Sequence, residues 1–129
     1  MTDTILTENR DGVLVVRFNR PERKNAINNE MWLAIRDTFR SAAADDSVVC
    51  VLLCGEGDNY CSGVDLSSFT ESVPGEEHPF VVAARAVAEF DKQLVAAAQG
   101  AAVGGGATVL FHADIVYVGE SLRQRLPVA

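Results

Sequence analysis

The stretch NNEMWLAIRDTFRSAAADDSVVCVLL, residues 28–53, decides the fold class. Its first part carries apolar residues at a spacing that places them on one face of a helix. These residues are Met31, Ile35, Phe39 and Ala42. Asn28 is a suitable N-cap for this helix, which we expect to continue to about Ala44. Residues 48–53 are then uninterruptedly apolar, a run typical of a strand buried on both faces of a parallel sheet.

The same kinds of pattern continue upstream and downstream of this stretch. Residues 5–8 and 13–18 are β-type runs on either side of Asp11-Gly12, a turn signal that predicts a hairpin. Residues 80–90 have a helical pattern. Its inner face is predicted to carry Val81, Ala84 and either Val87 or Ala88.

Two further strands and a short helix complete the predicted order. Residues 94–98 and 114–118 are the strands, and residues 107–112 between them form the helix. A hairpin followed by alternating helices and buried strands predicts an α/β layered domain with a largely parallel sheet. We expect residues 1–129 to form this single domain, with right-handed crossovers.

The composition excludes several classes of protein. The chain has 129 residues, 48% of them hydrophobic, and a formal net charge of −7, which argues against a dedicated nucleic-acid binder. Its N-terminus lacks the basic and apolar regions of a signal peptide. Cysteine occurs three times without a zinc-type Cys/His cluster, so we expect reduced thiols, no metal and a cytoplasmic location.

The uncharged run from Gln93 to Ala113 is long enough to span a bilayer. It consists mostly of alanine and glycine, which supply little transfer energy. We therefore expect a buried strand, loop and helix there, and no membrane span.

Two glycine-containing loops follow buried strands and are the candidate binding segments. They are residues 61–66, CSGVDL, and residues 100–106, GAAVGGG. Ligands of open α/β sheets lie beyond the carboxyl ends of the strands. The second loop also begins a helix, whose free N–H groups favour negative charge, so two N–H groups there could form an oxyanion hole. The alternative is that residues 104–106 only allow close packing of helix and strand.

Basic residues gather in one part of this acidic chain. The cluster comprises Arg17, Arg20, Arg23 and Lys24. It could hold phosphate groups, or it could be a solvated loop. Conventional catalytic sets are missing: His78 falls in a polar loop, His112 lies near a helix end, and we interpret Cys61 as a packing residue.

Four sequence motifs, taken together, point to a known family. They are Asn19-Arg20-Pro21 with Asn25-Ala26-Ile27, then residues 60–66, then residues 99–106, and finally Ala113-Asp114-Ile115. In this order and spacing they resemble the crotonase superfamily, the enoyl-CoA hydratase/isomerase family, over nearly the whole chain.

The resemblance implies a spiral of ββα units, of which this chain carries the N-terminal portion, and an acyl-CoA thioester substrate. Coenzyme A belongs to that substrate, so no separate cofactor is expected. The oxyanion donors would be the N–H groups of Val64 and Gly105. Residues expected along the rest of the substrate are Arg23, Lys24, Ala26, Ser62, Asp65, Leu66, Gly104 and Thr108. Of these, Arg23 or Lys24 would lie near phosphates.

Two positions depart from the pattern of the hydratases. Thr108 stands where they carry one catalytic glutamate, and Val128 follows Pro127 where they carry the other. A threonine hydroxyl does not act as a carboxylate base near neutral pH. Isomerases of the family draw a single glutamate from a Pro-Glu pair further along, beyond Ala129. We therefore expect a chain truncated before the C-terminal helices, from a parent that assembles into trimers or hexamers.

Three functional hypotheses follow. The first is an enoyl-CoA isomerase-like enzyme that shifts a double bond while the oxyanion hole holds the enolate. The second is a catalytically incomplete fragment that binds acyl-CoA or partner subunits. The third is an enoyl-CoA hydratase that uses other side chains.

Overall fold

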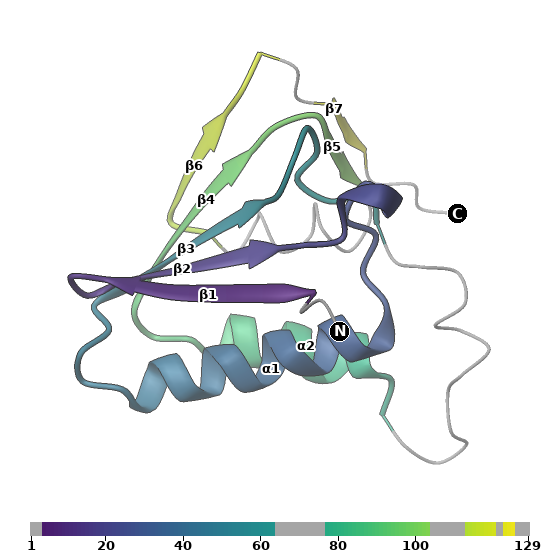
Figure 1. Ribbon diagram of the computed structural model, residues 1–129. Coiled ribbons are helices and arrows are strands. Elements are labelled where there is room, and N and C mark those ends of the chain that lie inside the picture. Colours follow the sequence, from purple (N-terminus) through teal and green to yellow (C-terminus); the bar gives the residue numbers. More distant parts are fainter. Residues whose placement is uncertain (1–3, 64–76, 104–112, 121–122, 126–129) are drawn as a thin grey trace.

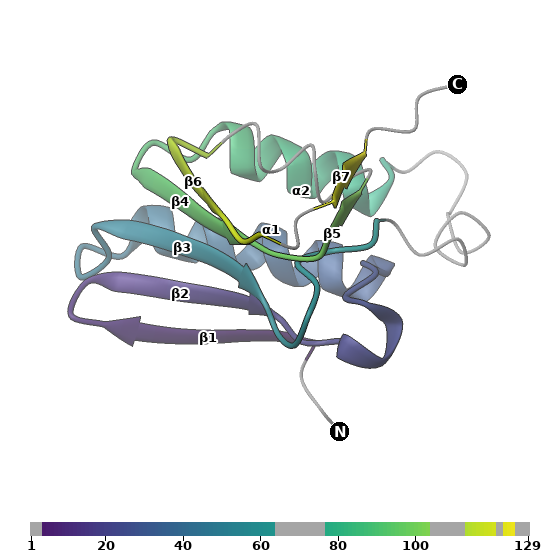
Figure 2. The same cartoon turned by 90° about the horizontal axis from the view of Figure 1, so that it is seen from above.

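The structure, a computed structural model, describes residues 4–63, 77–103, 113–120 and 123–125 (Figure 1). Five strands form the main sheet in the order β1-β2-β3-β4-β6, and two helices lie against one of its faces. The strands are β1 (Ile5–Arg10), β2 (Val13–Phe18), β3 (Cys50–Gly55), β4 (Gln93–Ala98) and β6 (Ile115–Val118). The helices are α1 (Asn29–Ala44) and α2 (Pro79–Ala88). Beside this sheet, β5 (Ala101–Val103) pairs with β7 (Arg123–Arg125), as Figure 2 shows from above.

The hairpin predicted at the N-terminus is confirmed. β1 and β2 pair antiparallel from Ile5↔Phe18 to Arg10↔Val13. Asp11 and Gly12 have φ values of 54° and 95°, as a two-residue turn with two left-handed positions requires. Asparagine, aspartate and glycine reach that region most easily, which explains why the Asp-Gly pair closes this hairpin.

The parallel sheet is also confirmed, with one correction. β2, β3, β4 and β6 run parallel, and Val51 of β3 lies between Leu14 and Leu94 in the register. β3 begins at Cys50, where its pairing with both β2 and β4 begins, so the strand starts two residues later than predicted. Burial on both faces was wrong: buried residues alternate with half-buried ones along β3. Helices α1 and α2 both lie against the same face of the sheet (Figure 1).

Helix α1 has the predicted start, end and inner face. The Asn28 side chain accepts a hydrogen bond from the backbone N–H of Met31 at 2.9 Å, and the helix ends at Ala44. Its buried residues are Met31, Trp32, Ile35, Phe39 and Ala42. This stripe belongs to the core that α1 shares with the sheet and α2, and it supplies the largest buried side chain, Trp32.

We predict that Asn28→Ala lowers the free energy of unfolding by about 1 kcal/mol, because the first turn of α1 loses its cap. Urea denaturation followed by circular dichroism measures the change. Ser41→Ala is the matched control, since Ser41 lies exposed in the same helix and its loss should change stability by less than about 0.5 kcal/mol. Equal effects of the two substitutions would contradict the capping role.

Helix α2 corrects the predicted inner face. Of the predicted residues, Val87 is buried as expected, Ala84 is half-buried, Val81 is 42% exposed and Ala88 is exposed. The other buried residues are Ala83 and Ala86. The sequence PFVVAARAVA is apolar nearly all round, so its periodicity allows more than one stripe.

The start of α2 gives a role to a histidine that was expected in a loop. The Nδ1 atom of His78 accepts a hydrogen bond from the Phe80 N–H at 3.1 Å, so His78 caps the helix. The helix ends at Ala88, two residues before the predicted end.

Two short strands, β5 and β7, come after strands of the main sheet and form a second, two-stranded sheet. The chain bends after β4 into β5, and β7 comes after β6 in the sequence. β5 lies inside the segment expected to be a loop, where its pairing with the distant β7 makes it a strand. The expected helix at residues 107–112 lies outside the described residues. Within the described part of the chain, no helix has the length and apolar character needed to cross a bilayer.

Candidate functional site

Three segments that follow parallel strands come together at one end of the main sheet. The first loop is residues 20–27 after β2, the second is residues 56–63 after β3, and the third is the bend at residues 99–100 after β4. Because the carboxyl ends of parallel strands lie at the same edge, these segments become neighbours. We call them together the three-loop site.

The first loop is held in a tight left-handed turn. A single 3₁₀ turn, Pro21–Arg23, leads into Lys24 and Asn25, whose φ values are 52° and 59°. The Asn25 N–H donates to the carbonyl oxygen of Arg20 at 2.9 Å, and the Arg20 guanidinium donates to the carbonyl of Ala26 at 3.1 Å. This turn leaves the side chains of Arg23 and Lys24 exposed.

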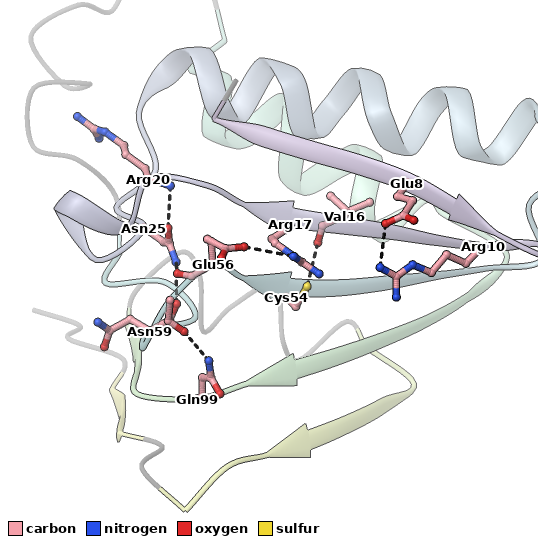
Figure 3. Close-up of polar contacts among 11 residues, drawn as sticks. Glu8, Arg10, Val16, Arg17, Arg20, Asn25, Cys54, Glu56, Asn59 and Gln99 are labelled. Carbon is pink, nitrogen blue, oxygen red and sulfur yellow. Dashed lines mark hydrogen bonds and ion pairs between the residues drawn. The ribbon is translucent and has the colours of Figure 1, made fainter. Parts of the chain in front are cut away.

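The Asn25 side chain connects the first loop to the second (Figure 3). Its Oδ1 atom accepts from the backbone N–H of Arg20 at 2.8 Å. Its Nδ2 atom donates to the carbonyl oxygens of Glu56 at 2.9 Å and Asn59 at 2.7 Å. Asn25 has no exposed surface and is the one fully buried polar residue in the described part of the chain. Both N–H groups of the side-chain amide therefore donate to backbone carbonyls.

Backbone hydrogen bonds join the end of the second loop to the first loop. The Ser62 N–H donates to the Lys24 carbonyl at 3.0 Å, and the Ser62 hydroxyl donates to the Arg23 carbonyl at 3.2 Å. The Ile27 N–H donates to the Gly63 carbonyl at 2.8 Å. These bonds fix residues 62–63, which lead directly into Val64.

The third segment binds the second loop through its backbone and one side chain. The Tyr60 N–H donates to the Gln99 carbonyl at 2.7 Å, and the Gln99 Nε2 donates to the Gly57 carbonyl at 2.6 Å. Gly100 has φ of 61°, and a Cβ atom there would lie 2.1 Å from the Asp58 carbonyl oxygen. Only glycine allows this bend to lie so close to the second loop.

Tyr60 anchors the second loop in the core. Its ring is fully buried, with its centroid 5.2 Å from that of Phe18. This burial raises the pKa of the Tyr60 phenol well above its ordinary value, because the charged form would lose its hydration. The neighbouring Cys61 is buried in the same core cluster, which confirms its interpretation as a packing residue.

The structure divides the basic cluster. Arg17 lies on β2, and its guanidinium contacts the Glu56 carboxylate at 3.2 Å (Figure 3). The Cys54 sulfur and the Glu56 carboxylate beside its guanidinium raise the pKa of Arg17. Arg17 is thus engaged on the strand, whereas Arg23 and Lys24 remain the exposed bases of the first loop.

Four of the predicted substrate-binding residues are brought together here. Arg23 and Lys24 are exposed, Ala26 and Ser62 are half-buried, and the bonds between the first two loops hold all four in one place. The other predicted residues lie outside the described part of the chain. These are Val64, Asp65, Leu66, Gly104, Gly105 and Thr108.

Sequence reasoning missed how Asn25 and Gln99 act. Both stand in the quoted motifs, but no role was assigned to either side chain. Composition and periodicity carry no signal for them, because both donate to backbone carbonyls far along the chain. Within the described residues, no three His, Cys, Asp or Glu side chains lie close enough to hold a metal ion.

Comparison with known proteins identifies the family. The sequence profile described as enoyl-CoA hydratase/isomerase matches residues 8–127. The chain belongs to this family. Human enoyl-CoA delta isomerase 2 is 38% identical to this family member over 126 residues, which cover 92% of the chain and 32% of the human protein. Enoyl-CoA hydratase EchA19 of Mycobacterium tuberculosis is 32% identical over 127 residues, covering 92% of the chain and 47% of that relative.

A solved structure shows the same fold in this enoyl-CoA hydratase/isomerase family. The enoyl-CoA hydratase/isomerase of Pseudoalteromonas atlantica T6c superposes with a TM-score of 0.89 at 33% identity. The match covers 95% of this chain and 49% of that structure. The present family member thus has the N-terminal portion of the crotonase fold and spans a third to a half of these relatives.

Proposed function

We propose that the three-loop site binds the coenzyme A part of an acyl-CoA thioester and aims two backbone N–H groups at its carbonyl oxygen. The observation that supports this most is the set of bonds joining Arg23 and Lys24 to Ser62. These bonds link the exposed basic turn to residues 62–63, which precede Val64 in the sequence. A single rigid unit could therefore hold phosphate at one end and the thioester at the other.

The basic turn would bind the phosphates of coenzyme A. Arg23 and Lys24 are exposed cations in a chain of net charge −7, so they provide a local site for an anionic ligand. Ala26, Ser62, Asp65 and Leu66 would line the adenine and pantetheine. This assignment rests on the family pattern and on the proximity of Ala26 and Ser62 to the basic turn.

The N–H groups of Val64 and Gly105 would stabilise the enolate that forms when a proton leaves the carbon next to the thioester. Gly104 and Thr108 would lie beside the acyl group. Donors that are already in place when charge develops lower the barrier without reorganisation. The bonds at Gly63 and Gln99 hold the segments that lead into these two donors.

The reaction we favour is an isomerase-like shift of a β,γ double bond to the α,β position. One carboxylate would remove a proton from the α carbon and return it to the γ carbon. Thr108 and Val128 replace the two glutamates of a hydratase, so paired hydration chemistry has no support in these residues. The same replacements favour a second candidate, in which this chain binds acyl-CoA without turnover.

One assay separates these candidates. The 129-residue chain is incubated with a 3-enoyl-CoA, and formation of the conjugated 2-enoyl thioester is followed by its absorbance. Turnover supports the isomerase-like function and would place its carboxylate within residues 1–129, whereas binding without turnover supports the second candidate for this chain. Failure to bind any acyl-CoA at saturating concentration would overturn both.

We predict that Lys24→Ala and Arg23→Ala each weaken acyl-CoA binding about tenfold, because each removes a charge-assisted contact with phosphate. Isothermal titration calorimetry measures the dissociation constants. Added salt should weaken wild-type binding more than that of the variants. Arg40→Ala is the control, since Arg40 is an exposed cation on α1. If Arg40→Ala lost as much affinity as the other two, the contacts would be non-specific.

The oligomeric state and location also belong to this proposal. We propose a homo-oligomer, a trimer or hexamer in the parent protein, and a cytoplasmic site of action. The apolar residues Ile115–Val118 of β6 are 39–65% exposed at the edge of the sheet, which supports association with further protein.

A further inference from the structure

We infer that Asn25 is a positioning residue whose buried side-chain amide sets the relative placement of the three loops for coenzyme A. This inference rests on the proposed function and assigns to it a residue that touches no substrate. The three hydrogen bonds of the Asn25 side chain all join it to backbone groups, those of Arg20, Glu56 and Asn59. One amide thus ties the first loop to two points of the second.

The site demands an amide. The Glu56 and Asn59 carbonyls both need donors, while the Arg20 N–H needs an acceptor. Asparagine supplies all of these on a short side chain, whereas aspartate would place a carboxylate against two carbonyl oxygens. Asparagine also tolerates the left-handed φ of 59° better than most residues.

Gly55, at the end of β3, leaves the space that the Asn25 amide occupies. A Cβ atom at Gly55 would lie 2.9 Å from the Asn25 Nδ2 and 2.5 Å from the Asn59 carbonyl oxygen. The absence of that carbon lets the amide reach both carbonyls. The amide comes from the first loop and the glycine from the end of β3, so their fit fixes the distance between the first loop and the strand that leads into the second loop.

Asn59 also positions the third segment, residues 99–100. Asn59, whose carbonyl binds the Asn25 amide, also packs against Gly100, where a Cβ atom would lie 2.6 Å from the Asn59 Oδ1. The Gln99 side chain binds the Gly57 carbonyl beside it. A shift of residues 57–59 would therefore move the bend that leads into β5.

A positioning role differs from simple stabilisation in what it affects. A residue that only stabilises the fold changes the folded fraction, and the folded molecules then bind ligand normally. A positioning residue changes affinity even when every molecule is folded.

The variants for this test are Asn25→Asp, which removes both donors at nearly constant shape, and Asn25→Gly, which keeps the left-handed turn and admits water. Phe39→Leu, a core change far along α1, is the control for stability.

Calorimetry with coenzyme A, at a temperature where all proteins are folded, measures the effect. We expect Asn25→Asp and Asn25→Gly to weaken binding by at least about tenfold, and Phe39→Leu by less than about twofold. Lower pH should partly restore binding to Asn25→Asp, because a protonated carboxyl can donate one of the lost bonds. Variants that bind like wild type would overturn the inference while leaving the proposed function intact.

Hydrogen exchange without ligand provides a readout that does not depend on the proposed function. We expect Asn25→Gly to speed the exchange of backbone amides at residues 56–63 and 99–101, and Phe39→Leu to leave them unchanged relative to the core. Unchanged exchange in Asn25→Gly would overturn the inference. Wild-type protein that binds no coenzyme A but shows this exchange response would instead overturn the proposed function alone.

Discussion

Gly100→Ala is expected to lower the free energy of unfolding by about 3 kcal/mol or more, from backbone clash and an unfavourable left-handed φ together. The new Cβ atom would lie 2.1 Å from the Asp58 carbonyl oxygen, so the backbone of the second loop must move. The bend itself has φ of 61°, which an alanine adopts only with strain. Urea denaturation measures the stability, and calorimetry with an acyl-CoA should show lost binding in the molecules that still fold.

Gly57→Ala is the matched control for this prediction. Gly57 also has a positive φ, 82°, but a Cβ atom there meets only the Pro21 Cβ at 3.4 Å, an ordinary contact. We expect it to cost about 1 kcal/mol, the conformational part alone. If the two variants had equal free energies of unfolding, Gly100 could not lie as close to the second loop as the structure places it.

Trp32→Ala is the second substitution with a large expected effect, a loss of about 3–5 kcal/mol of stability. The Trp32 side chain has no exposed surface and is the largest in the core. Its ring meets that of Phe80 on α2 edge to face, with centroids 4.9 Å apart. Removing the ring takes away this contact with α2 and leaves a cavity in the core.

Leu33→Ala is the control for the core substitution, because the neighbouring Leu33 is 37% exposed. We expect a loss below about 1 kcal/mol there, measured by the same urea denaturation. Similar losses for the two variants would mean that the buried face of α1 is assigned to the wrong residues.

Much of the fold could be predicted because local patterns decide it. The Asp11-Gly12 turn, the Asn28 cap and the stripe from Met31 to Ala42 each have one favourable structure, and all appear as predicted. The face of α2 could not be predicted, because a helix of alanines and valines presents apolar surface in nearly every direction. β5 was missed for a related reason: three small residues become a strand only through the distant β7.

The candidate site was predictable in its location but only partly in its construction. Strand order alone brings together the segments after β2, β3 and β4, and Arg23, Lys24, Ala26 and Ser62 accordingly lie in neighbouring loops. The bonds of Asn25 were not predictable, since any asparagine in a polar loop could as well face solvent. The roles of Val64 and Gly105 stay predictions from the family pattern.

Hydrogen exchange of the 129-residue chain, with and without a saturating enoyl-CoA, tests most directly the claim that the three loops form one acyl-CoA site. We predict that the ligand slows exchange together at residues 20–27, 60–66 and 99–105, and leaves the hairpin at Asp11-Gly12 unchanged. Slower exchange confined to another place, such as the 340 Å³ hollow lined by Thr7, Asp37 and Val48, would contradict the claim. Unchanged exchange everywhere would contradict it as well.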